Sequence, residues 1–230
     1  MTSVALAEEL LLLAYDDETG RCGVPVIALD LGMAAAILVD LVLHGRIEVS
    51  DRLVVPVDAS PTGHDINDEV LGRIGAERPE PAAFWLQRLR HNLRQHVLDR
   101  LVAHGVLRDQ DVTAWDVLRV HRYPMIDSSL EEAARRRLSA ALAGESATDE
   151  WTAALAALVA AVRMEPTLGL SADALHKAHQ QLEEIAAAAG FASGATLEQS
   201  TVRPSVAFLI AELYHAVRAA LGPVRPASAG

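Results

Sequence analysis

One segment restricts the fold of this chain more than any other. Residues 27–43 are apolar on every side of a helix, apart from Asp30 and Asp40. Such a helix has no face to present to water, so it belongs in the middle of a bundle. No window of the sequence approaches about 18 uninterrupted apolar residues, and we therefore expect a buried bundle helix rather than a membrane span.

A tight β-hairpin is expected directly after this helix. The helix stops at residues 44–46, and two short runs then alternate as paired strands that join at Ser50-Asp51. The alternating residues are Ile47, Val49, Leu53 and Val55. A Pro-Thr-Gly loop at residues 61–63 follows the second strand and leads into a short acidic helix.

The rest of the chain is dominated by helical patterns. Apolar spacing and alanine content predict further helices over residues 3–15, 65–74, 82–104, 128–142, 149–163, 171–189 and 204–221. Residues 109–123 remain open, because Val112 and Trp115 fit helical spacing while Val117 and Val120 suit a strand. The two prolines at residues 78–81 make the only candidate linker. We expect a mainly α fold with one domain over residues 1–221 and a disordered tail at 222–230.

Composition excludes several classes of partner and site. The formal net charge is −11, which disfavours binding to nucleic acid or to anionic membranes except at a local basic patch. Cys22 is the only cysteine, so no disulfide within the chain and no multi-cysteine zinc site can form. Lys177 is the only lysine, and the heavy use of Arg and Ala suggests a GC-rich genome.

No known catalytic or cofactor-binding motif is present. The sequence has neither a Gly-x-Gly-x-x-Gly run nor a P-loop, and its serines lack a nucleophile-elbow context. His176 and His179 share a helix face with Glu183, but this arrangement matches no metal motif, and we interpret it as a polar surface. Asp65, Asp68 and Glu69 are interpreted as solvated helix-start acids. We therefore expect no enzyme, no metal and no cofactor.

The clearest charge feature is an arginine-rich stretch in residues 82–104. Arg90, His91 and Arg94 would share one helix face with few acids among them, and arginine's rigid fork suits phosphate. This predicts an anion site. The alternative is that these side chains pair with the many acids elsewhere, and spacing alone favours that alternative. Arg135, Arg136 and Arg137 are explained by helix stabilisation, since two acids precede them by about one turn.

Several ordered segments together resemble the Golgi phosphoprotein 3 family. The matching pieces are the opening residues 6–20, the central helix running into the hairpin at 37–47, the Pro-Thr-Gly loop with its acidic pair at 60–69, and the arginine helix with its glycine stop at 94–107. Their order and spacing cover roughly the first half of the chain. From the Arg and Ala content and this resemblance, we identify the chain as a bacterial member.

The resemblance implies a central helical bundle surrounded by amphipathic helices, a small β-hairpin, and no catalysis. It also implies a peripheral membrane protein that binds the head group of phosphatidylinositol 4-phosphate, with the hairpin (Val49, Asp51, Leu53, Val55) used for self-association. The family's pocket uses a tryptophan and three arginines, whose positions here fall at Pro25, Ala34, His91 and Arg94. Only Arg94 is retained, and each missing charge-assisted bond removes on the order of 1.5–3 kcal/mol.

Three functional hypotheses follow. The first is a non-enzymatic adaptor, cytoplasmic or peripheral on the cytoplasmic face of a membrane, that binds an anionic phospholipid head group at Arg90, His91 and Arg94. A histidine gains charge only below about pH 6.5, so such binding should tighten as the pH falls. The second is a protein-interaction module that self-associates through the hairpin without a lipid ligand. The third is a winged-helix DNA-binding protein, which the acidic charge argues against.

Overall fold

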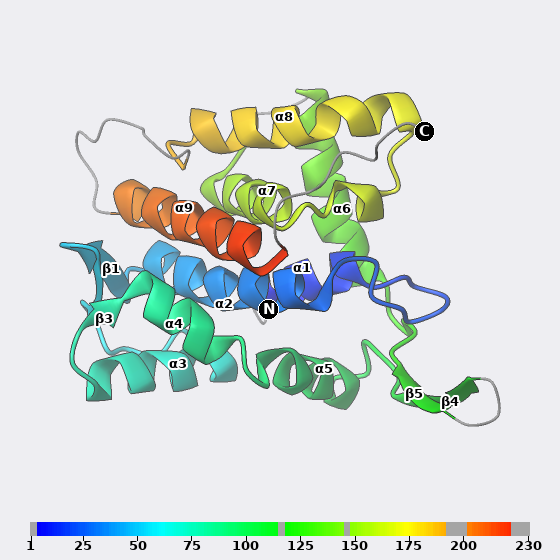
Figure 1. The fold of residues 1–230 in the computed structure, drawn as a ribbon, viewed down its shortest axis with the longest axis horizontal. Helices are drawn as coiled ribbons and strands as arrows, with labels where there is room; N and C mark the ends of the chain where they lie inside the picture. Colours follow the sequence, from blue (N-terminus) through cyan, green and yellow to red (C-terminus); the bar gives the residue numbers. More distant parts are fainter. Residues whose placement is uncertain (1–3, 115–117, 145–147, 192–201, 222–230) are drawn as a thin grey trace.

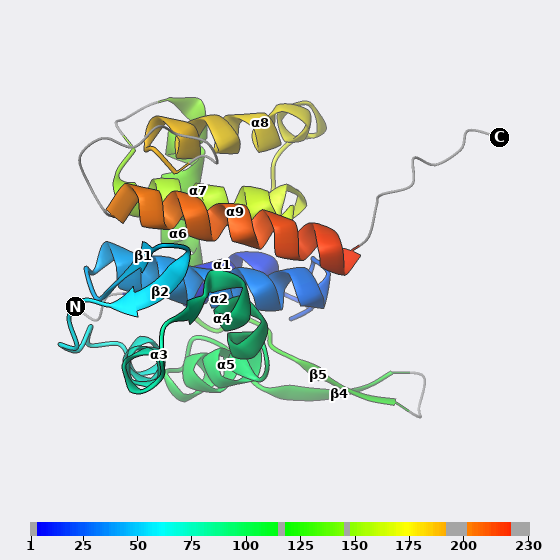
Figure 2. The same ribbon diagram turned by 60° about the vertical axis from the view of Figure 1, so that its left-hand side comes forward.

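The computed structural model describes residues 4–114, 118–144, 148–191 and 202–221. Helices surround a central helix on all sides, and two small β-sheets lie at the periphery (Figures 1 and 2). The elements, in chain order, are α1 Leu6–Ala14, α2 Val26–Leu43, β1 Ile47–Ser50, β2 Leu53–Pro56, α3 Asp65–Ala76, β3 Glu80–Pro81, α4 Ala82–Leu89, α5 Leu93–Ala103, β4 Gln110–Ala114, β5 Leu118–Arg122, α6 Ser129–Ala143, α7 Glu150–Val162, the short 3-10 helix η1 Glu165–Leu168, α8 Ala172–Ala188 and α9 Val202–Leu221.

Helix α2 lies at the centre of the bundle, as its all-round hydrophobicity predicts. It runs between α1, α7 and α9, with α3, α4 and α5 on its remaining side (Figure 1). By length and composition α2 could cross a bilayer, but 78% of it is buried inside the fold, which identifies it as a core helix. A Cβ atom added at Gly32 would lie 2.6 Å from Cγ1 of Val162 on α7. The absence of a side chain at Gly32 therefore permits the close contact between α2 and α7.

A second helix is buried almost completely. Every residue of α7 from Thr152 to Val162 is buried, and it contacts α2, α8 and α9. Asp149 caps its start, because the Asp149 carboxylate accepts the N–H of Thr152 at 2.8 Å. Alanine makes up half of this helix, and its small side chains let neighbouring helices approach closely. The mainly α prediction is confirmed, and α1, whose residues are all buried, joins α2 and α7 in the core.

The hairpin after α2 is confirmed, with two corrections. Ser50 pairs with Leu53, so the turn residues are Asp51 and Arg52 rather than Ser50-Asp51. Both turn residues have positive φ, the conformation that a two-residue hairpin with a right-handed twist requires. The predicted linker at 78–81 contributes a third strand, β3, because Glu80 and Pro81 pair with β2. Strand β2 is therefore the middle strand of the sheet.

Residues 110–114 and 118–122, left open above, form two paired strands that the sequence did not predict as a pair, while Trp115 and Val117 lie outside the described residues. Strands β4 and β5 pair antiparallel with Val112 opposite Val120, and they extend away from the bundle (Figure 2). The base of the hairpin is attached to the loop after α1. Tyr123 makes an edge-to-face contact with Tyr15 at 6.1 Å, and its N–H donates to the carbonyl oxygen of Gly20.

The prediction of one long helix over residues 82–104 is wrong. It is two helices, α4 and α5, separated at Asn92, which has a left-handed backbone with φ of 65°. Asparagine tolerates this conformation better than most residues. The break lets α4 lie against α2 and α9 while α5 lies against α1 and α2. Ser3 and the tail at 222–230 lie outside the described residues, and the single-domain boundary stays a prediction.

Candidate functional site

The break at Asn92 changes the geometry of the predicted anion site. Arg90 is the C-cap residue directly after α4, His91 lies in the turn, and Arg94 lies in the first turn of α5. The expectation that Arg90, His91 and Arg94 share one helix face is therefore wrong. The three residues instead surround the corner between two helices, which we call the α4–α5 corner (residues 90–94).

Arg94 is held by groups from two other elements. Its Nε donates to Oδ1 of Asp30 on α2 at 2.9 Å, and its Nη1 donates to the hydroxyl of Tyr15 at 3.2 Å. The side chains of Arg94 and Asp30 are 30% and 18% exposed. Burial is the largest influence on the pKa of Arg94 and lowers it, but Tyr15 and Asp30 together outweigh burial and raise that pKa. The guanidinium is thus firmly charged and already has an anionic partner.

The other two residues of the corner are freer. Nε of Arg90 donates to the side-chain carbonyl of Gln87 at 2.8 Å, and within the described part of the chain no carboxylate pairs with Arg90. His91 is exposed. The first turn of α5 carries no acidic residue, and the side chain of Asn92 makes no capping bond to it. Unsatisfied backbone N–H groups at such a helix start favour an anion.

The α4–α5 region stands out on an acidic protein. Residues 81–98 contain three arginines and two histidines but no Asp or Glu. Arg88 reaches back to Glu77 at 2.8 Å, and Arg94 reaches Asp30. Spacing alone favoured pairing with distant acids, and this is what the structure shows for these two arginines. For Arg90 and His91, the described residues show no such pairing.

The two other positions that the resemblance predicts for a pocket, Pro25 and Ala34, lie at the N-cap of α2 and within α2. Pro25 is the exposed N-cap of α2, whereas Ala34 is fully buried in the core. Asp30 lies one turn before Ala34 and so points from the same side of the helix. At the position where the resemblance leads us to expect an arginine, this chain therefore has the buried methyl group of Ala34, and one turn away the Asp30 carboxylate accepts a hydrogen bond from Arg94.

The predicted self-association residues lie in a sheet that contacts α9. The N–H of Val49 donates to Oγ of Ser205 at 2.8 Å, so the outer edge of β1 is partly satisfied by α9. Leu53 and Val55 belong to the middle strand and are half-buried, and Asp51 is exposed at the turn. Val57, just beyond β2, is 60% exposed, the highest value among the exposed large apolar side chains of the described chain.

Histidines and arginines elsewhere serve other contacts. Nδ1 of His179 contacts the carboxylate of Glu165, and Nε2 contacts that of Glu183. The two carboxylates therefore lie at opposite ring nitrogens and do not meet at one point, as metal ligands would. The side chain of His176 lies outside the described residues. Arg135 and Arg136 pair with the acids one turn earlier, as predicted. Arg137 instead reaches Glu9 on α1 at 2.7 Å, a pair that the sequence did not indicate.

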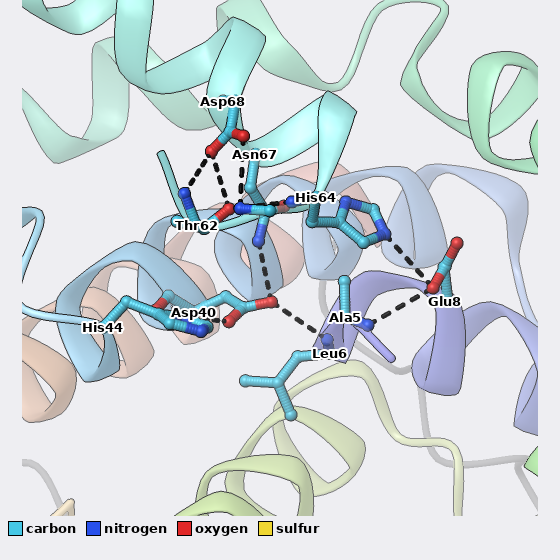
Figure 3. A network of polar contacts seen from close by, with 10 residues as sticks. Ala5, Leu6, Glu8, Asp40, His44, Thr62, His64, Asn67 and Asp68 are labelled. Atoms are coloured by element: carbon cyan, nitrogen blue, oxygen red, sulfur yellow. Dashed lines mark hydrogen bonds and ion pairs between the residues drawn. The ribbon is translucent and has the colours of Figure 1, made fainter. Parts of the chain in front are cut away.

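A buried polar network, also missed from the sequence, links α1, α2 and α3 (Figure 3). Asp40 is fully buried, and its Oδ2 accepts the N–H of Leu6 at 3.2 Å and the amide of Asn67 at 2.9 Å. Its other oxygen lies 3.0 Å from Nδ1 of His44. His64 lies 3.2 Å from Glu8 in the same region. The network fixes the start of α1 against α2, and Asp68 holds the Pro-Thr-Gly loop by accepting the N–H and the hydroxyl of Thr62.

A family model described as Golgi phosphoprotein 3 (GPP34) matches residues 6–219, from the start of α1 almost to the end of α9. The chain is also similar to vacuolar protein sorting-associated protein 74 of Eremothecium gossypii, with 26% identity over 174 residues, covering 65% of this chain and 52% of that protein. The chain thus spans about half the length of this relative. A bacterial origin stays a prediction. The extent of the family match, over nearly every helix described above, shows that the chain belongs to the Golgi phosphoprotein 3 family.

Proposed function

We propose that this chain is a non-enzymatic adaptor that attaches peripherally to a membrane by binding an anionic head-group phosphate at the α4–α5 corner. The observation that carries the proposal is the combination of Arg90, His91 and the charged Arg94 around an uncapped helix start, within a stretch free of acids. Phosphate is the anion that a rigid guanidinium fork and free helix N–H groups suit best.

Binding at this corner is expected to be weak and sensitive to salt. Arg94 is the only pocket arginine retained, and an incoming phosphate must compete with Asp30 for it. Ligand affinity should therefore fall as the ionic strength rises.

Vesicle flotation tests this function. Vesicles with and without phosphatidylinositol 4-phosphate are compared at low salt and pH about 6, using the native chain, Arg94→Ala and the matched variant Arg136→Ala. Arg136 is exposed on α6, and among the described residues its ion-pair partner is Glu132 of the same helix. We expect binding that requires the phosphorylated lipid and is lost in Arg94→Ala only. Equal flotation with both vesicle types would refute the head-group site.

Self-association through the hairpin is the second candidate. The observation that favours it is the exposed Val57 next to the half-buried Val55 at the end of a short sheet. Light scattering over a dilution series should then show a dimer that weakens in Val57→Asp. A monomer at every concentration would eliminate this candidate and leave the lipid-binding function untouched.

A further inference from the structure

Tyr15 connects the end of α1 to the α4–α5 corner. It is the C-cap residue of α1, and its backbone forms an isolated antiparallel β-bridge with Cys22. Only 6% of Tyr15 is exposed, yet its hydroxyl reaches Arg94 and accepts a hydrogen bond from Nη1 at 3.2 Å. The two residues are 79 positions apart in the sequence, so no local pattern joins them. Tyr15 therefore lies directly beside the pocket arginine that the resemblance retains.

A second buried tyrosine holds the ring of Tyr15 in place. Tyr123, directly after β5, is also 6% exposed and packs edge-to-face against Tyr15, with ring centres 6.1 Å apart. Gly20 permits this approach, because a Cβ atom added there would lie 2.4 Å from the backbone nitrogen of Tyr123. The hydroxyl of Tyr123 accepts a hydrogen bond from Nε2 of Gln95, outside the corner, at 3.2 Å. Edge-to-face pairing stabilises both rings, so the hydroxyl of Tyr15 is fixed beside Arg94.

Both partners of this contact keep unused hydrogen-bond donors. A guanidinium has five N–H groups, and a tyrosine hydroxyl can accept and donate at once. Arg94 uses its Nε on Asp30 and one N–H of Nη1 on Tyr15. Among the described residues, no group accepts a hydrogen bond from Nη2 of Arg94 or from the hydroxyl of Tyr15. Since Nη1 and the hydroxyl oxygen are 3.2 Å apart, one bound anion can accept from both side chains.

The hydroxyl of Tyr15 is suited to donate because it stays protonated. Burial is the largest influence on the pKa of Tyr15 and raises it, and this outweighs the opposite effect of Arg94. A neutral hydroxyl also adds a donor to the corner without adding charge. The guanidinium is held at two points, by Asp30 and by Tyr15, so a ligand meets donors whose positions are already fixed.

We infer that Tyr15 is an anion-binding residue of the α4–α5 corner, whose hydroxyl donates to the phosphate that Arg94 binds. The inference rests on the proposed function and adds a ligand-binding side chain from the end of α1 that the family resemblance does not assign. A phosphate monoester suits this arrangement, because its three terminal oxygens can accept from the guanidinium, the hydroxyl and the N–H groups at the start of α5 together. A carboxylate has only two oxygens to offer.

Two matched variants test the role of this hydroxyl. Tyr15→Phe removes the hydroxyl and keeps the ring, and Tyr123→Phe removes the hydroxyl of an equally buried ring that contacts Gln95 instead of Arg94. Affinity is measured by isothermal titration for the soluble inositol phosphate head group of phosphatidylinositol 4-phosphate. We expect Tyr15→Phe to weaken binding about tenfold, because a hydrogen bond to a charged group is lost. Tyr123→Phe should stay within about twofold of the native chain.

Two further measurements separate direct contact from a structural role. The hydroxyl carries no charge, so Tyr15→Phe should lower affinity by the same factor at every salt concentration, whereas Arg94→Ala should also reduce the salt dependence. Binding should change the ultraviolet absorption of tyrosine in the native chain and in Tyr123→Phe, since the bound anion accepts a hydrogen bond from the hydroxyl of Tyr15. The same change should be absent in Tyr15→Phe.

Equal affinity in Tyr15→Phe, Tyr123→Phe and the native chain would overturn the inference and leave the head-group site intact. Binding to the native chain without a change in tyrosine absorption would overturn it as well, and this result does not depend on the stability of any variant. Failure of the native chain to bind the soluble head group would refute the proposed function and the inference together. Thermal unfolding of each variant identifies any loss of affinity that comes from misfolding.

Discussion

Removing the charge of Asp30 should strengthen anion binding at the α4–α5 corner. In the native chain the Asp30 carboxylate accepts a hydrogen bond from Nε of Arg94 at 2.9 Å, so it occupies the group that a phosphate would use. Asp30→Asn keeps the shape and an acceptor oxygen but removes the charge. A ligand then competes with a neutral amide instead of a carboxylate.

The size of the effect follows from the geometry of the pair. Hydrogen bonds to charged groups contribute about 1.5–3 kcal/mol when well shielded from water. Arg94 is 30% exposed, and exposed pairs are worth about 1 kcal/mol or less, so an intermediate value of about 1–1.4 kcal/mol is reasonable. Apparent affinity scales with the fraction of the site that is free to bind. Freeing Arg94 should therefore tighten binding about fivefold to tenfold.

Isothermal titration with the soluble inositol phosphate, at low salt and fixed pH, measures this change. Asp99→Asn is the matched control, because it alters net charge equally on α5 but removes a carboxylate that bonds to Gln95 instead of Arg94. The gain in Asp30→Asn should shrink in Arg94→Ala. Equal affinity in Asp30→Asn and Asp99→Asn would show that Arg94 is not the group that receives the anion.

Three further predictions concern the scaffold. Gly32→Ala should lower the free energy of unfolding by about 1–3 kcal/mol, because the added methyl group clashes with Val162 on α7. Chemical denaturation measures this free energy, and a change under about 0.5 kcal/mol would contradict the close packing. Asp40→Ala should lower the free energy of unfolding by at least about 3 kcal/mol, since the substitution leaves the N–H of Leu6 and the amide of Asn67 buried without an acceptor. A loss as small as that of a substitution at an exposed residue would argue against the network. The hydrogen bond to Asp40 raises the pKa of His44 above its ordinary value of 6.5, so this contribution to stability is complete below that value and is lost as the pH rises through the folded-state pKa. Melting temperatures of His44→Gln should therefore vary less over this pH range than those of the native chain, and parallel curves would contradict the pairing.

Local sequence patterns predicted the parts of the fold that depend on local physics. The all-round hydrophobicity of residues 27–43 required burial, and burial in a bundle follows wherever such a helix lies in water. The hairpin followed from alternation between a helix stop and a proline, although its turn was misplaced by one residue. The same reasoning failed at residues 82–104, because helical spacing continues through Asn92 while the break depends on which neighbours each half contacts.

The candidate site also combines features that are evident in the sequence with contacts that depend on the tertiary structure. The arginines near Arg94 are evident in the sequence, whereas the assignment of pocket positions to Pro25 and Ala34 rests on the family resemblance and stays a prediction. The pairing of Arg94 with Asp30, which is 64 residues away, could not be read from the sequence, because helix periodicity relates only residues within a few turns. Only the tertiary structure decides which acid reaches which arginine, since that choice depends on how α2 and α5 cross and on how much water remains between them.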